Sequence, residues 1–461
     1  MSKKTQNESL NVRCPGPTWQ DVLDEDEKQI PYFLRSEAPY RGGLEDIATS
    51  RYLTREWHEL EKKQLWSRVW QYVCREEQLS NVGSYVVYDI ADQSYIVVRT
   101  EDNSIKAYPN ACLHRGRILK THDGRATEFR CSFHGWSWQL DGKLKLIPAE
   151  WDFPHAEERN LDLPGMKVET WEGFVFLNPD PSAQPLGDFL GPEIQKHFAR
   201  WDFENRYLSA HVAKIIRCNW KVAIEAFSEG YHVGATHPQG ATYTGDPQSQ
   251  IDVWGNVARE LSPKGIPSPL LDEPPTQEQM LRDALDVREG EALPLDFKEG
   301  DTLRKILSAK GRERFRPSFG DRVDEIGDAE FLDAWNYSVF PNFHPWGAFN
   351  RIVFRFRPNG DDHESCIFEI MYLAPFQGER PESATIIHLG PDDPWSNAPV
   401  LEKLAMVVEQ DTFNMERVHQ GMKVLRRDSV MVSAYQESLV RWRHELLTVY
   451  IEERNAEGNE R

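Results

Sequence analysis

Two short segments in the first third of the chain each combine a cysteine with a histidine. Cys112 and His114 form the first pair, and Cys131 and His134 form the second pair after sixteen intervening residues. Thiolates and imidazoles in equal number can hold a two-iron, two-sulfur cluster, with the cysteines on one iron and the histidines on the other. The spacing therefore predicts an electron-carrying cluster held between two loops.

This mixed set of ligands is typical of a Rieske centre, whose reduction potential lies above that of an all-cysteine plant-type ferredoxin. A structural zinc site is the alternative, because two cysteines and two histidines also satisfy tetrahedral zinc. Zinc motifs usually separate the cysteine pair from the histidine pair, whereas each segment here mixes them. Respiratory-chain Rieske proteins carry two further cysteines, which form a disulfide, but the matching residues here are Arg117 and Phe133.

The chain as a whole has 461 residues, enough for two or three domains with full hydrophobic cores. Its net charge of −20 argues against a nucleic-acid partner, because phosphate binding needs a basic surface. No apolar stretch approaches the length of a membrane span, and the first ten residues are polar. We therefore expect a soluble, cytoplasmic protein without a membrane partner. No glycine-rich nucleotide-binding loop is present, so its electrons must come from another protein.

Local patterns divide the chain into three predicted regions. Residues 1–68 form a polar arm and a helix that Thr54 caps. Residues 69–180 contain short β-rich runs and the Asp-Gly turn at 141–142, which indicate a small antiparallel β domain. Residues 181–461 form a larger domain in which strand signals are interrupted at 262–320 by a charged, partly helical segment, either a solvated excursion or a lid.

A second group of candidate ligands follows Asn-Trp-Lys at positions 219–221. If this segment continues as a helix, Glu225, Glu229 and His232 fall at i, i+4 and i+7 and share one face. His237 would lie about 140° away from His232 on that helix.

A turn after the first histidine removes this difficulty. Gly234 can break the helix, and Pro238 disfavours helical geometry at His237, so the two imidazoles can come together. Two histidines and one carboxylate are what an oxygen-activating iron commonly requires. The alternative is a surface helix with unrelated histidines.

The missing carboxylate is predicted from a later helix that starts near Asn397. Its apolar stripe is interrupted at one position by Asp411, and the apolar members are Leu401, Leu404, Val408, Met415 and Val418. A carboxylate on a buried face is costly unless it is paired or bound to metal. Asp411 is therefore the candidate third ligand, and a buried ion pair with an arginine is the alternative.

Together these motifs resemble the large catalytic subunit of Rieske non-haem iron ring-hydroxylating oxygenases. The resemblance extends from Trp66 to Gly421 and rests on the mixed cysteine–histidine pairs, the Asn-Trp-Lys to His-x4-His segment, and Glu-Gln-Asp at 409–411. It implies an α+β fold, in which an antiparallel β Rieske domain precedes a helix-grip catalytic domain with a twisted antiparallel sheet.

The resemblance also implies cofactors and roles. Each subunit would hold one [2Fe-2S] cluster on the four cysteine and histidine ligands and one ferrous iron on His232, His237 and Asp411. Glu229 matches the acid that links an iron histidine to a Rieske histidine of the neighbouring subunit, although many members have aspartate there. Glu225 stands where some dioxygenases have asparagine.

The expected activity is oxygenation by dioxygen of a largely apolar, aromatic or polycyclic small molecule, by dihydroxylation or monooxygenation. A ferredoxin, an NAD(P)H-dependent reductase, or both would supply electrons. A homotrimer is expected, with or without a small β subunit. Two alternatives are an electron-transfer protein whose second constellation is structural, and a zinc-dependent hydrolase that uses Glu229 as its base.

Overall fold

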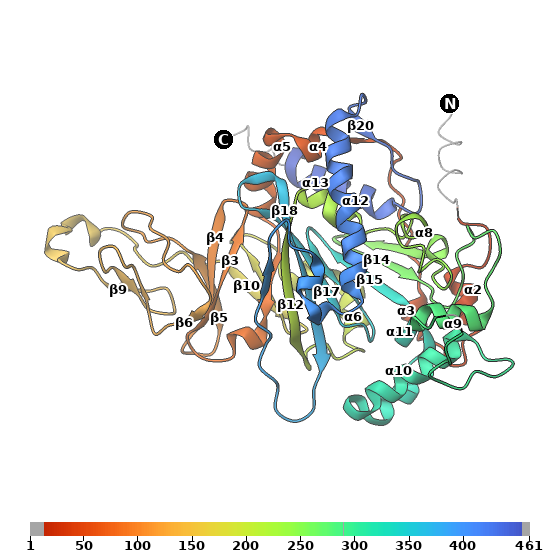
Figure 1. Cartoon of the computed structure of the whole chain (residues 1–461). Helices are drawn as coiled ribbons and strands as arrows, with labels where there is room; N and C mark the ends of the chain where they lie inside the picture. The colour runs from red at the N-terminus through yellow and green to blue at the C-terminus, as the bar shows by residue number, and fades with distance from the viewer. Residues whose placement is uncertain (1–12, 289, 454–461) are drawn as a thin grey trace.

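The computed structural model describes residues 13–288 and 290–453. In Figure 1 a β-rich part projects to the left, and a larger part on the right is built around one long sheet. Mixed helices and antiparallel strands confirm the predicted α+β fold class. No helix among the described residues combines the length and the apolar character needed to cross a membrane.

Three small antiparallel sheets form the β-rich part, and several predicted strands are confirmed there. Residues 84–90, one of the short β-rich runs predicted within 69–180, form β3, which pairs with β4, and the Asp-Gly turn at 141–142 joins β8 to β9. The strands are β2 (Gln71–Arg75), β3 (Ser84–Ile90), β4 (Gln93–Arg99), β5 (Ile105–Pro109), β6 (Gly124–Arg125), β7 (Phe129–Arg130), β8 (Ser137–Trp138), β9 (Leu144–Leu146), β10 (Lys167–Trp171) and β11 (Phe174–Asn178).

The larger part contains an eight-stranded sheet in the order β13-β14-β15-β16-β17-β18-β12-β19. Its neighbouring strands are antiparallel except for β12 and β19. The strands are β12 (Arg206–Ile216), β13 (Gln250–Trp254), β14 (Val257–Ser262), β15 (Ala334–Val339), β16 (Phe343–Pro345), β17 (Ile352–Asn359), β18 (Asp362–Pro375) and β19 (Ile387–Leu389). The two-residue strands β1 (Ile47–Ala48) and β20 (Ser429–Val430) pair separately.

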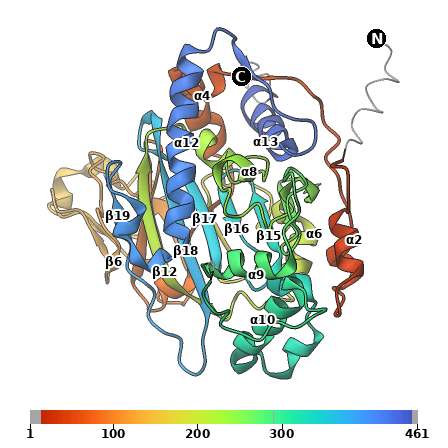
Figure 2. The same cartoon turned by 45° about the vertical axis from the view of Figure 1, so that its right-hand side comes forward.

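Helices cover this sheet, and α12 crosses it in both views (Figures 1 and 2). α7 packs on β17 and β18, and α12 packs beside α7. The helices are α2 (Trp19–Asp24), α3 (Tyr32–Arg35), α4 (Ser50–Leu53), α5 (Arg55–Leu60), α6 (Leu186–Phe198), α7 (Trp220–Glu225), α8 (Val233–Thr236), α9 (Gln277–Leu285), α10 (Leu303–Phe319), α11 (Asp328–Leu332), α12 (Leu404–Val424) and α13 (Ser438–Thr448).

Thr54 begins the predicted N-terminal helix, since its hydroxyl accepts a hydrogen bond from the backbone N–H of Trp57. The helix continues through a π-helical turn, η2 (Glu61–Trp66), and so ends close to residue 68, the end of the predicted N-terminal region.

A buried ion pair ties this helix to α7. The Nζ of Lys221 pairs with Glu61, and the indole N–H of Trp220 donates to the other carboxylate oxygen of Glu61 at 2.9 Å. Both charged side chains are fully buried, so each depends on the other for its stability in the core. The Asn-Trp-Lys sequence thus fixes the start of the segment that carries the candidate ligands.

An aromatic cluster anchors the end of that segment to the sheet. The ring of Phe227 lies 4.9 Å from that of Phe354 and 4.9 Å from that of Phe368, measured between centroids. Aromatic pairs of this kind contribute about 0.5–1.5 kcal/mol each beyond their burial. The chain between α7 and α8 is therefore held close to the centre of the sheet.

The charged segment at 262–320 contains α9 and α10 and has an apolar cluster of its own. Met280, Leu281 and Leu303 are buried in it, and Tyr243 packs against them. Because Tyr243 follows His237 closely in the chain, this segment covers the loop beyond the candidate ligands. The segment is therefore packed against the rest of the larger part and is not a solvated excursion.

Candidate metal centres

The two cysteine–histidine segments fold into matching loops. The N–H of Cys112 donates to the carbonyl of Arg117 at 2.8 Å, and the N–H of Cys131 donates to that of Trp136 at 2.8 Å. Within the loops, Gly116 and Gly135 donate back to the cysteine carbonyls, and both glycines have positive φ angles of 74° and 81°. Glycine adopts this conformation without steric cost, which explains its presence at the two equivalent positions.

The four candidate ligands converge at the tips of these loops. Both cysteine side chains are buried, and the rings of His114 and His134 lie 4.7 Å apart between centroids. Burial lowers the pKa of His114, which favours the neutral imidazole that metals bind, and its Nδ1 is buried without a hydrogen-bond partner in the described structure. A buried nitrogen of this kind is costly unless a ligand satisfies it. The site therefore fits a metal cluster.

The electrostatic environment of the two cysteines also fits a metal cluster. Burial opposes ionisation of Cys131, but backbone N–H groups of Phe133 and His134 that face its sulfur lower its pKa. Backbone N–H groups of His114 and Arg115 act on Cys112 in the same sense, although burial leaves the pKa of that thiol raised. Such N–H groups stabilise thiolates and also tune iron–sulfur clusters.

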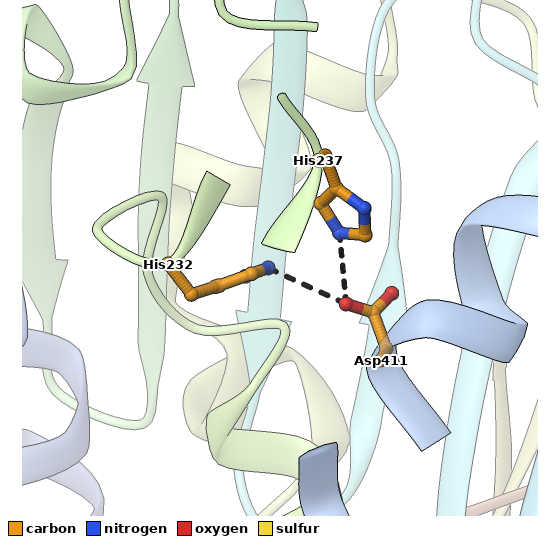
Figure 3. Close-up of side chains that lie close together, drawn as sticks. All are labelled: His232, His237 and Asp411. Atoms are coloured by element: carbon orange, nitrogen blue, oxygen red, sulfur yellow. Dashed lines mark hydrogen bonds and ion pairs between the residues drawn. The ribbon is translucent and has the colours of Figure 1, made fainter. Parts of the chain in front are cut away.

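A second group of ligands lies in the larger part. The side chains of His232, His237 and Asp411 each offer a ligand atom, and these atoms lie within 4.8 Å of one another. Oδ1 of Asp411 is 2.8 Å from Nε2 of His237 and 3.5 Å from Nε2 of His232 (Figure 3). Among the described residues, this is the one group of at least three His, Cys, Asp or Glu side chains that is compact enough for a single ion.

The local structure between the histidines differs from the predicted helix. α7 ends at Glu225, so Glu225, Glu229 and His232 do not share the face of a continuous helix. The hydroxyl of Ser228 bonds back to the carbonyl of Ile224, and a Cβ at Gly230 would lie 2.8 Å from Cβ of Asp246. This close approach requires glycine and directs the chain away from the helical path.

The expected break at Gly234 is also wrong, because that glycine lies inside the short helix α8. His232 precedes α8 and His237 ends it, with φ −121° and ψ 57°. Pro238 therefore marks the turn, and the two rings come within 5.3 Å between centroids.

The carboxylate comes from α12, which begins at Leu404 rather than near Asn397. The residues before it form two 3₁₀ turns, and Glu402 has a positive φ of 53° that interrupts helical geometry. Asp411 is buried as predicted, but Val418 is 48% exposed and the neighbouring His419 is buried in its place. The apolar stripe thus located Asp411 correctly although it placed one flanking residue wrongly.

The outer nitrogen of each histidine has its own partner. Nδ1 of His232 lies 2.7 Å from Oε1 of Glu229, and Nδ1 of His237 lies 2.8 Å from Oε1 of Gln410. Acceptors at Nδ1 fix the tautomer that leaves Nε2 free to bind a metal. Glu229 was identified from the sequence, but the contact of Gln410 was not, because it depends on the position of α12.

Electrostatic interactions between His232, Asp411 and Glu229 shift the pKa values of His232 and Asp411. Burial alone would lower the pKa of His232, but hydrogen bonds to Asp411 and Glu229 outweigh it and raise the pKa to about 10. Burial opposes ionisation of Asp411, whereas its hydrogen bonds to His232 and His237 lower its pKa. The site thus holds anionic oxygens around the imidazole of His232, which takes up a proton at the position that a metal cation would occupy.

A cavity of about 270 Å³ adjoins this group. Glu225 lines it and accepts a hydrogen bond from the hydroxyl of Tyr52 at 2.9 Å, and its other oxygen lies 2.8 Å from Nε2 of His444. Burial raises the pKa of Tyr52 well above its usual value, so the phenol remains protonated. Sequence reasoning missed Tyr52 and His444, because both are distant from Glu225 in the chain.

Comparison with known proteins defines the class. The family model described as the ring hydroxylating alpha subunit (catalytic domain) matches residues 195–453, and the model of the Rieske [2Fe-2S] domain matches residues 69–157. The chain belongs to the family of ring-hydroxylating alpha subunits. The two matches imply a Rieske [2Fe-2S] cluster and a mononuclear iron that uses dioxygen, as predicted, and they do not favour the electron-transfer or hydrolase alternatives.

Curated relatives are dioxygenase subunits. The chain is 31% identical over 230 residues to the biphenyl dioxygenase subunit alpha of Paraburkholderia xenovorans strain LB400, a match that covers 45% of this chain and 50% of that protein. It is 34% identical over 194 residues to the large oxygenase component of the naphthalene 1,2-dioxygenase system of Pseudomonas putida, covering 39% and 41%. The chain thus spans about half the length of the curated relatives it matches.

Solved structures share the fold over most of the chain. A crystal structure of the quaternary ammonium Rieske monooxygenase CntA with an inhibitor matches with a TM-score of 0.62 and 17% identity, covering 88% of this chain and 95% of that one. A naphthalene 1,2-dioxygenase variant bound to phenanthrene matches with a TM-score of 0.62 and 20% identity, covering 91% and 95%. At this level of identity the likeness describes the fold alone.

Proposed function

We propose that this protein is the oxygenase component of a Rieske non-haem iron system that hydroxylates a largely apolar, aromatic or polycyclic small molecule. The observation that carries the proposal is the convergence of His232, His237 and Asp411 in a chain that also has a Rieske domain. Two imidazoles and one carboxylate are typical of iron sites that leave coordination positions open for oxygen. Relatives named for biphenyl and naphthalene support the choice of substrate.

We assign the cluster to Cys112, His114, Cys131 and His134, and the iron to His232, His237 and Asp411. When bound, the cluster would supply single electrons and the ferrous ion would supply positions at which dioxygen is activated.

The side chains around the iron site hold its ligands in place. Glu229 and Gln410 face Nδ1 of His232 and His237, so Nε2 is the atom of each ring that would bind the metal once its proton is displaced. Burial of Asp411 keeps water from competing for its carboxylate.

Glu229 is proposed as a positioning residue that also faces the cluster of a neighbouring subunit. In Figure 1 the strands near the cluster, β7 to β9, lie on the opposite side of the molecule from α8. His134 is exposed at its loop tip, so it is free to meet another copy of the chain. We therefore propose a head-to-tail trimer, with or without a small β subunit, and domain boundaries near residues 68 and 180.

Electrons would come from a ferredoxin, an NAD(P)H-dependent reductase, or both, in the cytoplasm. The test combines the iron-replete protein with such a donor, labelled dioxygen and a panel that includes naphthalene and biphenyl. We expect a hydroxylated product that contains labelled oxygen. Its formation should be accompanied by oxidation of the reduced nicotinamide. If a protein with a reducible cluster and bound mononuclear iron yields no such product across the panel, the proposal fails.

A further inference from the structure

A second and larger cavity, of about 880 Å³, lies where α10 packs on α11 and on the ends of β17 and β18. Its walls include the rings of Phe315, Phe331, Phe349 and Tyr372. A Cβ at Gly311 would lie 2.8 Å from Cβ of Phe331, so glycine lets α10 approach this wall closely. We call this cavity the basic groove because of its charged residues.

Positive charge gathers at the basic groove although the whole chain has a net charge of −20. Lys310 and Arg314 lie one turn apart on α10 and are exposed, and neither forms an ion pair with any described residue. Arg206 is buried at the groove and donates to the carbonyls of Trp201 and Ala348 rather than to a carboxylate.

Most of the acids that line the groove are neutralised from elsewhere. Glu330 pairs with Arg200 at 2.7 Å, and Asp333 pairs with Arg304 at 2.6 Å. Arginines outside the groove therefore hold both carboxylates. The third lining carboxylate, Glu402, pairs with the lining residue Arg351 at 2.7 Å, and Lys403 pairs with Asp286 at 3.5 Å. Within the described residues this leaves Lys310, Arg314 and the buried Arg206 as the lining cations that form no ion pair. A focused positive potential of this kind attracts organic anions.

One wall of the groove is connected to the iron site through α12. Its lining includes residues 401–404, which run into the start of α12, and Asp411 follows Leu404 by seven residues, or about 10 Å of helix. Tyr372 donates its hydroxyl proton to the carbonyl of Leu401 at 3.0 Å, which fixes one wall of the groove to this end of α12.

Buried aromatic side chains connect this wall of the groove to the segment that carries the histidine ligands. Tyr372 and Phe368 lie four residues apart on β18 and so project from the same face of the sheet. The ring of Phe368 contacts Phe227, which precedes the histidine ligands in the chain.

We propose that the basic groove is the entrance for the substrate and that it selects an apolar aromatic molecule carrying a carboxylate. This inference rests on the proposed oxygenase function and narrows its substrate class. The aromatic walls would contact the ring, and Lys310 and Arg314 would attract the carboxylate during entry.

The test uses 4-fluorobenzoate as the probe and 4-fluorobenzylamine as its cationic counterpart, followed by fluorine NMR at low salt. Binding to the full-length protein is measured for the wild type, Lys310→Glu and Arg314→Glu. Lys298→Glu is the matched control, because Lys298 is exposed in the same 262–320 segment but does not line the groove. We expect each groove variant to weaken benzoate binding roughly five- to tenfold, with no effect in the control.

A second measurement, the fluorine relaxation rate of the bound benzoate, tests whether the groove leads to the metal. With the cluster oxidised, fluorine relaxation of the bound benzoate should be faster in the ferrous protein than in the same protein loaded with zinc. Equal benzoate affinity in the groove variants, equal binding of the amine, or equal relaxation with the two metals would overturn the proposal. The affinity measurement needs neither a reductase nor turnover, so its failure is separate from a failure to form product.

Discussion

Oδ1 of Asp411 lies 2.8 Å from Nε2 of His237, although 174 residues separate the two in the chain. The preceding residue, Gln410, contacts Nδ1 of the same ring at 2.8 Å. Two consecutive residues of α12 therefore contact the two nitrogens of one imidazole. This fixes the ring plane and its tautomer together, which is the arrangement that a preformed metal site requires.

Replacement of Asp411 tests the third ligand. Asp411→Ala should remove the mononuclear iron and product formation while the cluster spectrum remains intact, because the cluster ligands lie elsewhere. The helix should tolerate the change, since alanine favours helix and a buried charge is removed. Iron analysis and optical spectra measure both outcomes, with Asp321→Ala as an exposed control. Full activity in Asp411→Ala would rule out the assignment.

Glu229→Gln preserves shape but removes the charge that faces Nδ1 of His232. We expect both metals to remain bound and the cluster to accept electrons, while oxidation of the reduced cluster in the presence of substrate and oxygen slows roughly 10- to 100-fold. Rapid-mixing absorbance on metal-replete protein measures this rate. A wild-type rate would refute the coupling role, and loss of iron alone would identify Glu229 as a ligand instead.

Cys131→Ser should abolish the paramagnetic signal of the reduced cluster, because a hydroxyl is a poor substitute for the thiolate. Cys14→Ser should retain it, since that cysteine lies in the N-terminal arm. Electron paramagnetic resonance of the dithionite-reduced proteins makes the comparison. A colourless, zinc-loaded and fully folded wild-type protein would contradict the cluster.

Metal binding at the histidine–carboxylate site should strengthen as pH rises. The pKa of His232 is about 10 in the metal-free fold, well above the ordinary value of about 6.5. A metal ion must displace this proton, so its apparent affinity should increase from about pH 6.5 to 8.5, by at most tenfold per unit. Competition with a chromophoric chelator measures the trend, and a flat profile would show that the proton is not displaced.

The same shift predicts the stability of the metal-free protein. A raised pKa means that protonated His232 stabilises the fold, fully below about pH 6.5 and progressively less as pH rises towards 10. Thermal unfolding of the chelated protein should therefore occur at lower temperature at the alkaline end. His232→Gln should reduce this dependence.

The buried pair of Glu61 and Lys221 should matter for stability. Glu61→Ala leaves the ammonium of Lys221 uncompensated in the core, and we expect a loss of about 3–5 kcal/mol in the free energy of unfolding. Urea denaturation measures it. Glu56→Ala, an exposed carboxylate on the same helix, serves as the control, and an equal effect there would show that the pair is not special.

The sequence was most informative where ligands lie close together in the chain or interrupt a regular pattern. The four cluster ligands span a short segment, and Asp411 stood out because a charge broke an apolar stripe. Gln410 and Tyr52 were not found, since their partners are brought to them only by the packing of α12 and α4. Local spacing carries no signal for contacts of that kind.

Helix boundaries were the weaker part of the prediction. A continuous helix through Glu225 and His232 satisfies the 3.6-residue period, but α7 ends at Glu225, and the close approach of Asp246 to Gly230 holds the chain beyond it in a different path. The interaction of Glu229 with His232 survives because a compact turn brings the same two side chains together. Glu229 and His232 are thus brought together by the tertiary packing of this turn and not by helical spacing.

α12 begins beside the basic groove and presents Gln410 and Asp411 two turns later. A straight helix behaves as a stiff rod, so a displacement of its first turn moves both residues by the same amount. Occupation of the groove and the geometry of the iron ligands would then be mechanically linked. A molecule held against the first turn of α12 would then act on the two side chains that contact His237.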